Sequence, residues 1–162
     1  MTTLATGCAG PPKALEGEFS ALRPEVATES DIGTHVRWGG RLVKVDPERE
    51  RTCFEILSLP LGNNARPDGD AHPARRFLAC RDGFADPAAY PRERLVTITG
   101  ELIGFTTREI GEYEYHYPIV RARATHLWPR PQPQAAPYPV MRPWGYDPFW
   151  GPYPYADPRY RY

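Results

Sequence analysis

Short runs of alternating apolar and polar residues fill the middle of the chain. In the run 94–102, Val96 and Ile98 share one face while Thr97 and Thr99 share the other, which is the period of a half-buried strand. Four further runs have the same character and are separated by turn residues: 35–45, 52–61, 75–80 and 115–127. The pattern therefore predicts five strands and an all-β domain.

The first run changes its alternation at the Gly-Gly pair at 39–40. Val36 and Trp38 share one face before the glycines, whereas Val43 and Val45 have the opposite parity after them. One extra residue in a β-bulge at the glycines would turn all four side chains inward. We therefore expect a first strand that is bent at this pair.

The connections between the runs suggest the fold. Residues 62–73 are rich in Gly, Asn, Asp and Pro, which predicts a long loop between the second and third strands. Asp86 followed by Pro87 is typical of a helix start, so one or two helical turns should join the third and fourth strands. Three strands, a short helix and two more strands are the order of a small five-stranded OB-like barrel. A five-stranded meander sandwich is the alternative.

Composition limits the folded part to one domain. The chain has 162 residues, and its 20 prolines gather toward the two ends. Residues 33–129 are long enough for one core, and we assign them to the OB-like barrel. We expect residues 9–32 to be a flexible spacer and residues 130–162 to be a disordered tail rich in Pro, Tyr and Trp.

The N-terminus has the features of a lipidation signal. Small residues lead into Cys8 in the run L-A-T-G-C-A-G, and a polar stretch with Pro11 and Pro12 follows. A signal peptidase needs small side chains before its cut, and the new N-terminal cysteine takes the lipid. The long apolar region of an export signal is missing, so we interpret residues 1–8 as a truncated signal with a lipobox. The alternative is that Cys8 is an ordinary thiol.

The other two cysteines lie on neighbouring predicted strands. Cys53 is in the second run and Cys80 in the third, but pairing about the middle of the loop sets Cys80 opposite roughly residue 56. A disulfide and two separate buried thiols both remain open. The four histidines show no spacing typical of a metal site, so no metal ligands are predicted.

A possible ligand surface is formed by arginines of the third and fifth strands. Arg75, Arg76, Arg121 and Arg123 could gather on one side of the barrel, and OB-type sheets bind oligosaccharides and nucleic acids. The alternative is a solvated face on which these arginines pair with glutamates. The formal net charge is zero, so no overall field draws the chain to nucleic acid, which is not an expected partner.

The sequence carries no motif of a known catalytic class. We find no G-x-S-x-G elbow, no glycine loop that would cradle phosphate and no recognisable pair of carboxylates. We therefore predict no enzymatic activity and no cofactor, and a cell-wall hydrolase is disfavoured because it lacks a nucleophile. The aromatic tail could contact an envelope protein, a glycan or the bilayer interface, or it could be passive.

Several segments together resemble a known family. These are H-V-R-W-G-G-R-L-V at 35–43, G-F-A-D-P at 83–87, L-V-T-I-T-G at 95–100, and Y-P-I-V at 117–120 followed by Leu127-Trp128. With Cys8 in front of them, they resemble the Slp family of starvation-inducible outer-membrane lipoproteins of Gram-negative bacteria, over about residues 8–130.

The resemblance implies a location more than a mechanism. It implies an outer-membrane protein held by lipid on Cys8, on the periplasmic face, with a non-catalytic envelope or stress-related role. Ala9 after the cysteine fits outer-membrane sorting. The family offers no catalytic residues to transfer to this chain.

Overall fold

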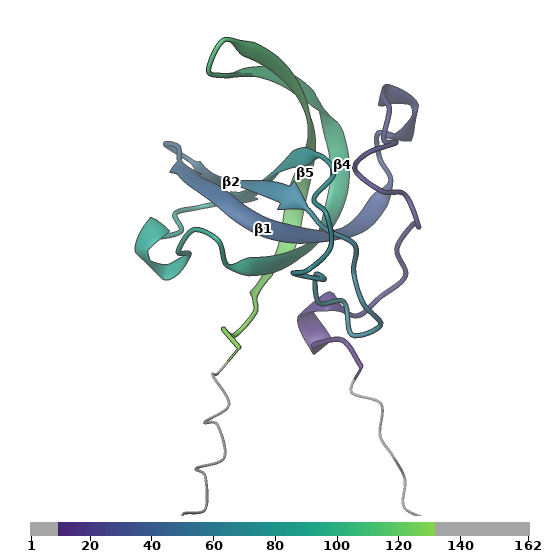
Figure 1. Cartoon of the computed structure of the whole chain (residues 1–162). Coiled ribbons are helices and arrows are strands. Elements are labelled where there is room, and N and C mark those ends of the chain that lie inside the picture. Colours follow the sequence, from purple (N-terminus) through teal and green to yellow (C-terminus); the bar gives the residue numbers. More distant parts are fainter. Residues whose placement is uncertain (1–9, 132–162) are drawn as a thin grey trace, which may run out of the picture. The chain divides into compact units, whose positions relative to one another are not determined.

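Five strands close into a barrel in the computed structural model, which describes residues 10–131 (Figure 1). They are β1 (His35–Pro47), β2 (Arg51–Ser58), β3 (Arg76–Asp82), β4 (Leu95–Ile110) and β5 (Tyr113–Leu127). The strand order is β1-β2-β3-β5-β4, and β4 pairs with β1 to complete the ring. All pairs are antiparallel except β3 with β5, where Leu78 lies opposite Ile119. This confirms the all-β, OB-like barrel.

The short helix expected between the third and fourth strands is a single 3-10 turn, η3 (Pro87–Ala89). Asp86 caps it as predicted, because its carboxylate accepts a hydrogen bond of 2.9 Å from the amide of Ala88. The loop between β2 and β3 makes a hairpin, since these two strands are antiparallel.

One core fills the barrel. Its buried members come from every strand, as the alternation of apolar residues requires. They are Ala27, Val36, Trp38, Leu42, Phe54, Ile56, Phe77, Ala79, Ala85, Val96, Ile98, Leu102 and Val120. A second, smaller cluster joins Leu15, Ala65 and Trp128, with Leu95 packed against it.

The bulge expected at the Gly-Gly pair is not there. Pairing of β1 with β4 continues without a shift through both glycines, and the bulge lies between Leu42 and Lys44 on the β2 side. It turns Val45 toward the core and leaves Val43 outside, half-buried. The glycines serve close packing instead, because a Cβ on Gly40 would overlap the carbonyl of Leu57.

The segment before β1 is packed against the barrel from Leu15 onward. The expectation that residues 9–32 are a flexible spacer is therefore wrong for residues 15–32. The side chain of Leu15 is completely buried, and its carbonyl accepts a bond from the Arg37 guanidinium at 3.0 Å. The Trp38 indole donates to the carbonyl of Leu22 at 2.7 Å. We call residues 10–34 the strap. A few buried contacts of this kind hold a segment whose composition is typical of a linker.

Candidate functional site

The distal halves of β4 and β5 form a long hairpin, which we call the arm (residues 104–117). It leaves the barrel at Gly104, where a shift in the β4–β5 register follows Leu102 and φ is +156°. From there the arm rises and curls over at one end of the barrel (Figure 1). Its tyrosines contact β2 and β3, because Tyr117 bonds to Glu55 and Tyr115 to Arg76. The arm is the largest feature that the sequence did not predict, since the fourth run was expected to end at Leu102.

The arm covers side chains that point out of the barrel. On β2, Phe54 and Ile56 belong to the core, so Cys53 and Glu55 between them face outward. Leu78 on β3 is also outward-facing, yet both Leu78 and Cys53 are only 1% exposed. The arm therefore occupies the face of β2 and β3, which is the face that binds ligands in OB-type barrels.

A carboxylate anchors the arm. Glu55 Oε1 accepts a hydrogen bond of 3.0 Å from the hydroxyl of Tyr117. The same oxygen lies 2.5 Å from the Arg76 guanidinium and forms an ion pair with it. The amide of Arg76 donates to the hydroxyl of Tyr115 at 2.9 Å. Both tyrosines belong to the arm, whereas Glu55 and Arg76 belong to the barrel. These bonds join the two parts.

Burial of this network changes its proton affinities. Burial, reinforced by the hydrogen bond to Glu55, raises the pKa of Tyr117 to about 12. The hydrogen bond to Glu55 also raises the pKa of the Arg76 guanidinium. Tyr117 therefore stays neutral and Arg76 stays charged at any physiological pH. The network is suited to structural contact rather than to proton transfer.

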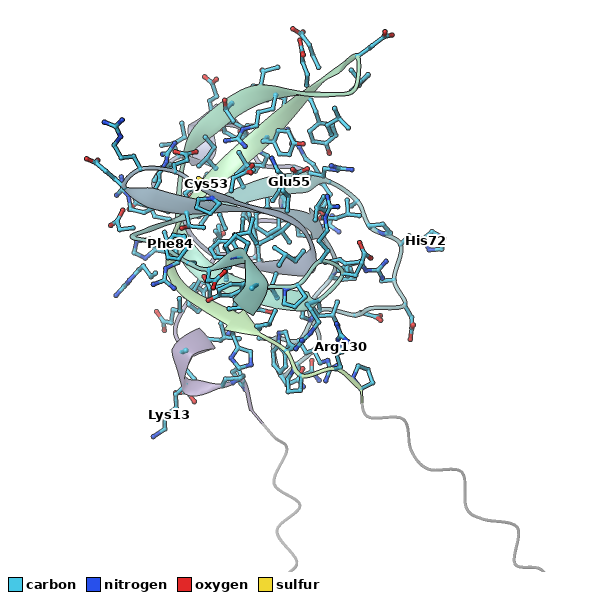
Figure 2. The ribbon with its side chains drawn as sticks, turned by 90° about the vertical axis from the view of Figure 1, so that its left-hand side faces the viewer. Lys13, Cys53, Glu55, His72, Phe84 and Arg130 are labelled. Carbon is cyan, nitrogen blue, oxygen red and sulfur yellow. A yellow bond between two sulfur atoms is a disulfide. The ribbon has the colours of Figure 1, made fainter. Side chains whose placement is uncertain are left out.

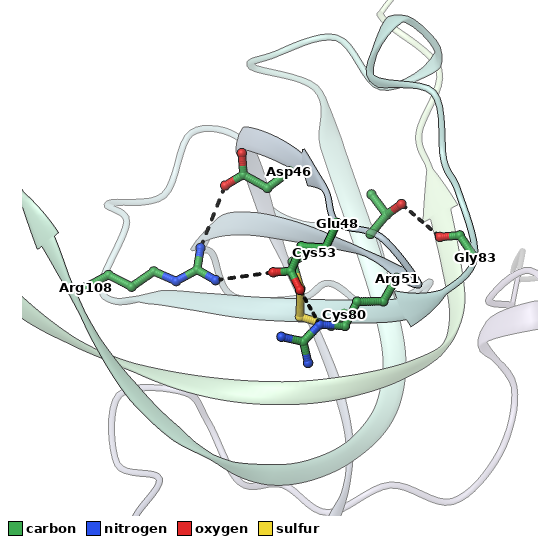
Figure 3. The surroundings of a disulfide bond; sticks show 8 residues. Asp46, Glu48, Arg51, Cys53, Cys80, Gly83 and Arg108 are labelled. Atoms are coloured by element: carbon green, nitrogen blue, oxygen red, sulfur yellow. Dashed lines mark hydrogen bonds and ion pairs between the residues drawn. A yellow bond between two sulfur atoms is a disulfide. The ribbon is translucent and has the colours of Figure 1, made fainter.

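A second anchor joins the arm to the end of β1 and to the turn that follows it (Figure 3). The Arg108 guanidinium lies 3.7 Å from the carboxylate of Asp46 and 3.9 Å from that of Glu48. Glu48 is also paired with Arg51 at 2.6 Å. Since these groups are partly exposed, each pair contributes little alone, but Arg108 links the arm to both carboxylates.

A disulfide lies beside this second anchor. Cys53 and Cys80 are directly opposed in the β2–β3 register, and their sulfurs are bonded across 27 residues of sequence (Figure 3). The offset of about three positions that the loop midpoint suggested is wrong. The loop is not symmetric, because Leu61 pairs with Pro67 inside it and shifts the register.

Two open depressions border the arm. A cleft of about 280 Å³ lies under it and is lined mainly by charged groups, including Lys44, Arg92 and Glu109. A shallower pocket of about 420 Å³ lies beside it, and its walls are Tyr113, Tyr115 and His116 of the arm with Glu25 and Arg75. Tyr113 is 70% exposed. An exposed aromatic with charged neighbours is suited to binding by contact.

The four arginines expected to form a ligand surface do not form one cluster. Arg75 donates to the carbonyls of Pro24 and His116, and Arg76 is paired with Glu55. Arg121 lies 3.7 Å from Glu101, and Arg123 lines a separate depression. Three of the four are therefore engaged within the protein.

Within residues 10–131, no group of His, Cys, Asp or Glu is arranged to hold a metal ion. No helix in the same part of the chain is both long and apolar enough to cross a membrane. Cys8, the proposed lipidation site, and the tail beyond Pro131 lie outside the described residues.

The sequence of the chain matches a known family. The profile of the outer membrane lipoprotein Slp family aligns with residues 5–160, which includes Cys8, the barrel and the tail. The chain belongs to this family. The resemblance carried by the short motifs is thereby confirmed over nearly the whole length.

Similar proteins come from two Gram-negative bacteria. A protein of Haemophilus influenzae described as uncharacterized is 34% identical over 76% of this chain and 69% of its own length. The lipoprotein YeaY of Escherichia coli is 29% identical over 94% of this chain and 81% of its own. The outer membrane protein Slp of Escherichia coli is also 29% identical, over 93% and 82%.

Proposed function

We propose that acyl chains on Cys8 hold this Slp-family protein at the outer membrane, with the barrel on the periplasmic face. The family consists of outer membrane lipoproteins, and the matched region contains the A-T-G-C-A run at 5–9. Cys53 and Cys80 are bonded to each other, so Cys8 is the remaining cysteine of three. The disulfide also suits an oxidising compartment such as the periplasm. The family match around Cys8 is the observation that carries the proposal.

Mass spectrometry of the native protein tests the anchor. We expect a mature N-terminus at Cys8 that carries fatty acids, and we expect the protein in the outer-membrane fraction. The matched control is Cys8→Ser, which leaves the barrel unchanged and should release the protein from the membrane. Unmodified full-length protein in the cytosol would contradict the proposal.

At the membrane the protein acts by contact rather than by catalysis, in maintenance of the envelope or in the response to stress. The central carboxylate supports this function, since Glu55 is engaged by both Arg76 and Tyr117, which hold the arm to the barrel. An exposed aromatic of the arm, Tyr113, lines an open pocket instead. The arm and the aromatic tail are the surfaces that we assign to partners, either an envelope protein or a glycan.

Binding experiments test the contact role. Purified protein is titrated with muropeptides, with short oligonucleotides and with envelope extracts after mild cross-linking. We expect a cross-linked protein partner that is lost in Tyr113→Ala. Turnover of muropeptides would contradict a non-catalytic function, whereas saturable binding of oligonucleotides would support the OB-type module that the covered β2–β3 face disfavours.

A further inference from the structure

The strap brings the folded barrel very close to Cys8. Lys13–Leu15 forms a 3-10 turn, and Leu15 is buried in the small cluster with Ala65 and Trp128. Only seven residue steps separate Cys8 from Leu15. A fully extended chain spans at most about 3.6 Å per residue, so this link reaches about 25 Å at most.

The described part of the link contains two prolines. Pro11 and Pro12 lie within it, and Pro12 has the extended conformation of a polyproline helix, with φ −53° and ψ 144°. Such a segment cannot fold back freely and advances about 3.1 Å per residue. The barrel is therefore held within about 25 Å of Cys8, whereas a flexible spacer of 24 residues would allow a much longer reach.

Both ends of the described chain leave from one end of the barrel. The small cluster joins Leu15 of the strap to Trp128 after β5, and Figure 2 places Lys13 and Arg130 at the same end. The arm lies at the opposite end in both Figure 1 and Figure 2. We call the end formed by Lys13–Leu15, the turn at 62–69 and residues 128–130 the anchored end.

The charges of the two ends differ. Lys13 and Arg130 are exposed at the anchored end, and Arg66 lies over the ring of Trp128 at 5.6 Å, although the exposed carboxylates of Glu16 and Asp68 are also present there. The arm tip instead exposes three glutamates, which are Glu109, Glu112 and Glu114. A surface of lipid phosphates attracts the first set and repels the second.

We propose that the anchored end rests against the lipid bilayer and that the arm tip points away from the membrane. This orientation rests on the proposed lipidation of Cys8, and it is supported by the short link, by the position of both ends of the described chain and by the charges of the two ends of the barrel. Consequently the pocket beside Tyr113 faces the aqueous space, where a soluble or wall-bound partner can reach it.

Paramagnetic relaxation of glycine amides tests this orientation. The acylated full chain, labelled with ¹⁵N-glycine, is inserted into lipid nanodiscs that contain a gadolinium-chelating lipid. Gly62 and Gly69 lie in the turn beside the anchored end, whereas Gly104 and Gly111 belong to the arm. We expect the signals of Gly62 and Gly69 to be lost and those of the arm glycines, above all Gly111, to remain.

A longer link provides the matched control. An insertion of about 20 Gly and Ser residues between Gly10 and Pro11 keeps Cys8 but adds about 25 Å of mean reach. We expect it to restore the signals of Gly62 and Gly69.

Two outcomes separate the proposals. Uniform signal loss in the acylated, disc-bound chain, or loss centred on the arm, would overturn the orientation and leave the anchor standing. Protein that carries no acyl group and does not associate with the discs would overturn the anchor and the orientation together.

Discussion

The disulfide between Cys53 and Cys80 should account for a large part of the stability of the barrel. The double substitution Cys53→Ala with Cys80→Ala removes a cross-link between residues that are 27 positions apart. The unfolded chain then gains conformational entropy, because this loop is no longer closed. In the chain-entropy treatment, a loop of this length stabilises the native state by about 3.5 kcal/mol. With a urea dependence of about 2 kcal/mol per molar, the unfolding midpoint should fall by roughly 2 M.

Urea unfolding in a Cys8→Ser background measures this effect without the anchor or a third thiol. The oxidised protein, the same protein with reductant, and the double alanine variant are compared. We expect the last two to agree within about 1 kcal/mol, which is the usual size of a small cavity effect. A thiol assay of the oxidised protein in denaturant should find no free thiol. If reduction leaves the midpoint unchanged, or if the assay finds two thiols, the reasoning is refuted.

Three further predictions concern the arm, the barrel closure and the strap. Tyr117 has a pKa of about 12 in the folded state against 10.0 ordinarily, so the folded protein holds this proton more tightly and stability is lost between pH 10 and 12, by up to about 3 kcal/mol. Urea unfolding should show this loss, and Tyr117→Phe should reduce it. Gly40→Ala should cost about 3 kcal/mol or more in thermal or urea unfolding, because the new Cβ meets backbone, whereas Gly69→Ala should change stability by less than about 0.5 kcal/mol. Leu15→Ala should cost about 2 to 4 kcal/mol and should expose the strap to limited proteolysis; an undigested strap would contradict its dependence on Leu15.

The barrel itself could be predicted because its strands follow the simple alternation of buried and exposed residues. The run 94–102 shows this best, since Val96, Ile98 and Leu102 all enter the core. The capped turn at Asp86 was readable for a similar reason, as its signal is local. The family resemblance was found from short motifs in the right order and is confirmed by the match over residues 5–160.

The arm was missed because its alternation serves a different purpose. Its residues face either solvent or the outside of β2 and β3, so polar and aromatic side chains replace the apolar ones of a core strand. One signal was available. Ile110 and Tyr113 pair across a two-residue turn that begins with Gly111 at φ +63°, and Gly at this position is typical of a tight hairpin.

The strap and the bulge were misjudged for lack of long-range information. A single buried leucine and a few bonds to backbone carbonyls are enough to hold residues whose composition is typical of a linker, and no local pattern reveals them. Likewise, the change of parity in β1 required a bulge somewhere between Trp38 and Val45. A bulge at the Gly-Gly pair was expected, but the bulge lies between Leu42 and Lys44. Glycine at position 40 instead allows the backbone to approach the Leu57 carbonyl closely.

The covered face of β2 and β3 limits how this barrel can bind a partner. A ligand that used this face would have to displace the arm and expose Leu78 and Tyr117, each of which contributes about 1.5 to 3 kcal/mol through burial. It would also separate Glu55 from Tyr117 and leave a carboxylate short of a donor. Several kilocalories would be lost before any contact with the ligand was made. Binding on the outer side of the arm, around Tyr113, avoids these free-energy losses. This is the surface that an anchored barrel would hold away from the membrane.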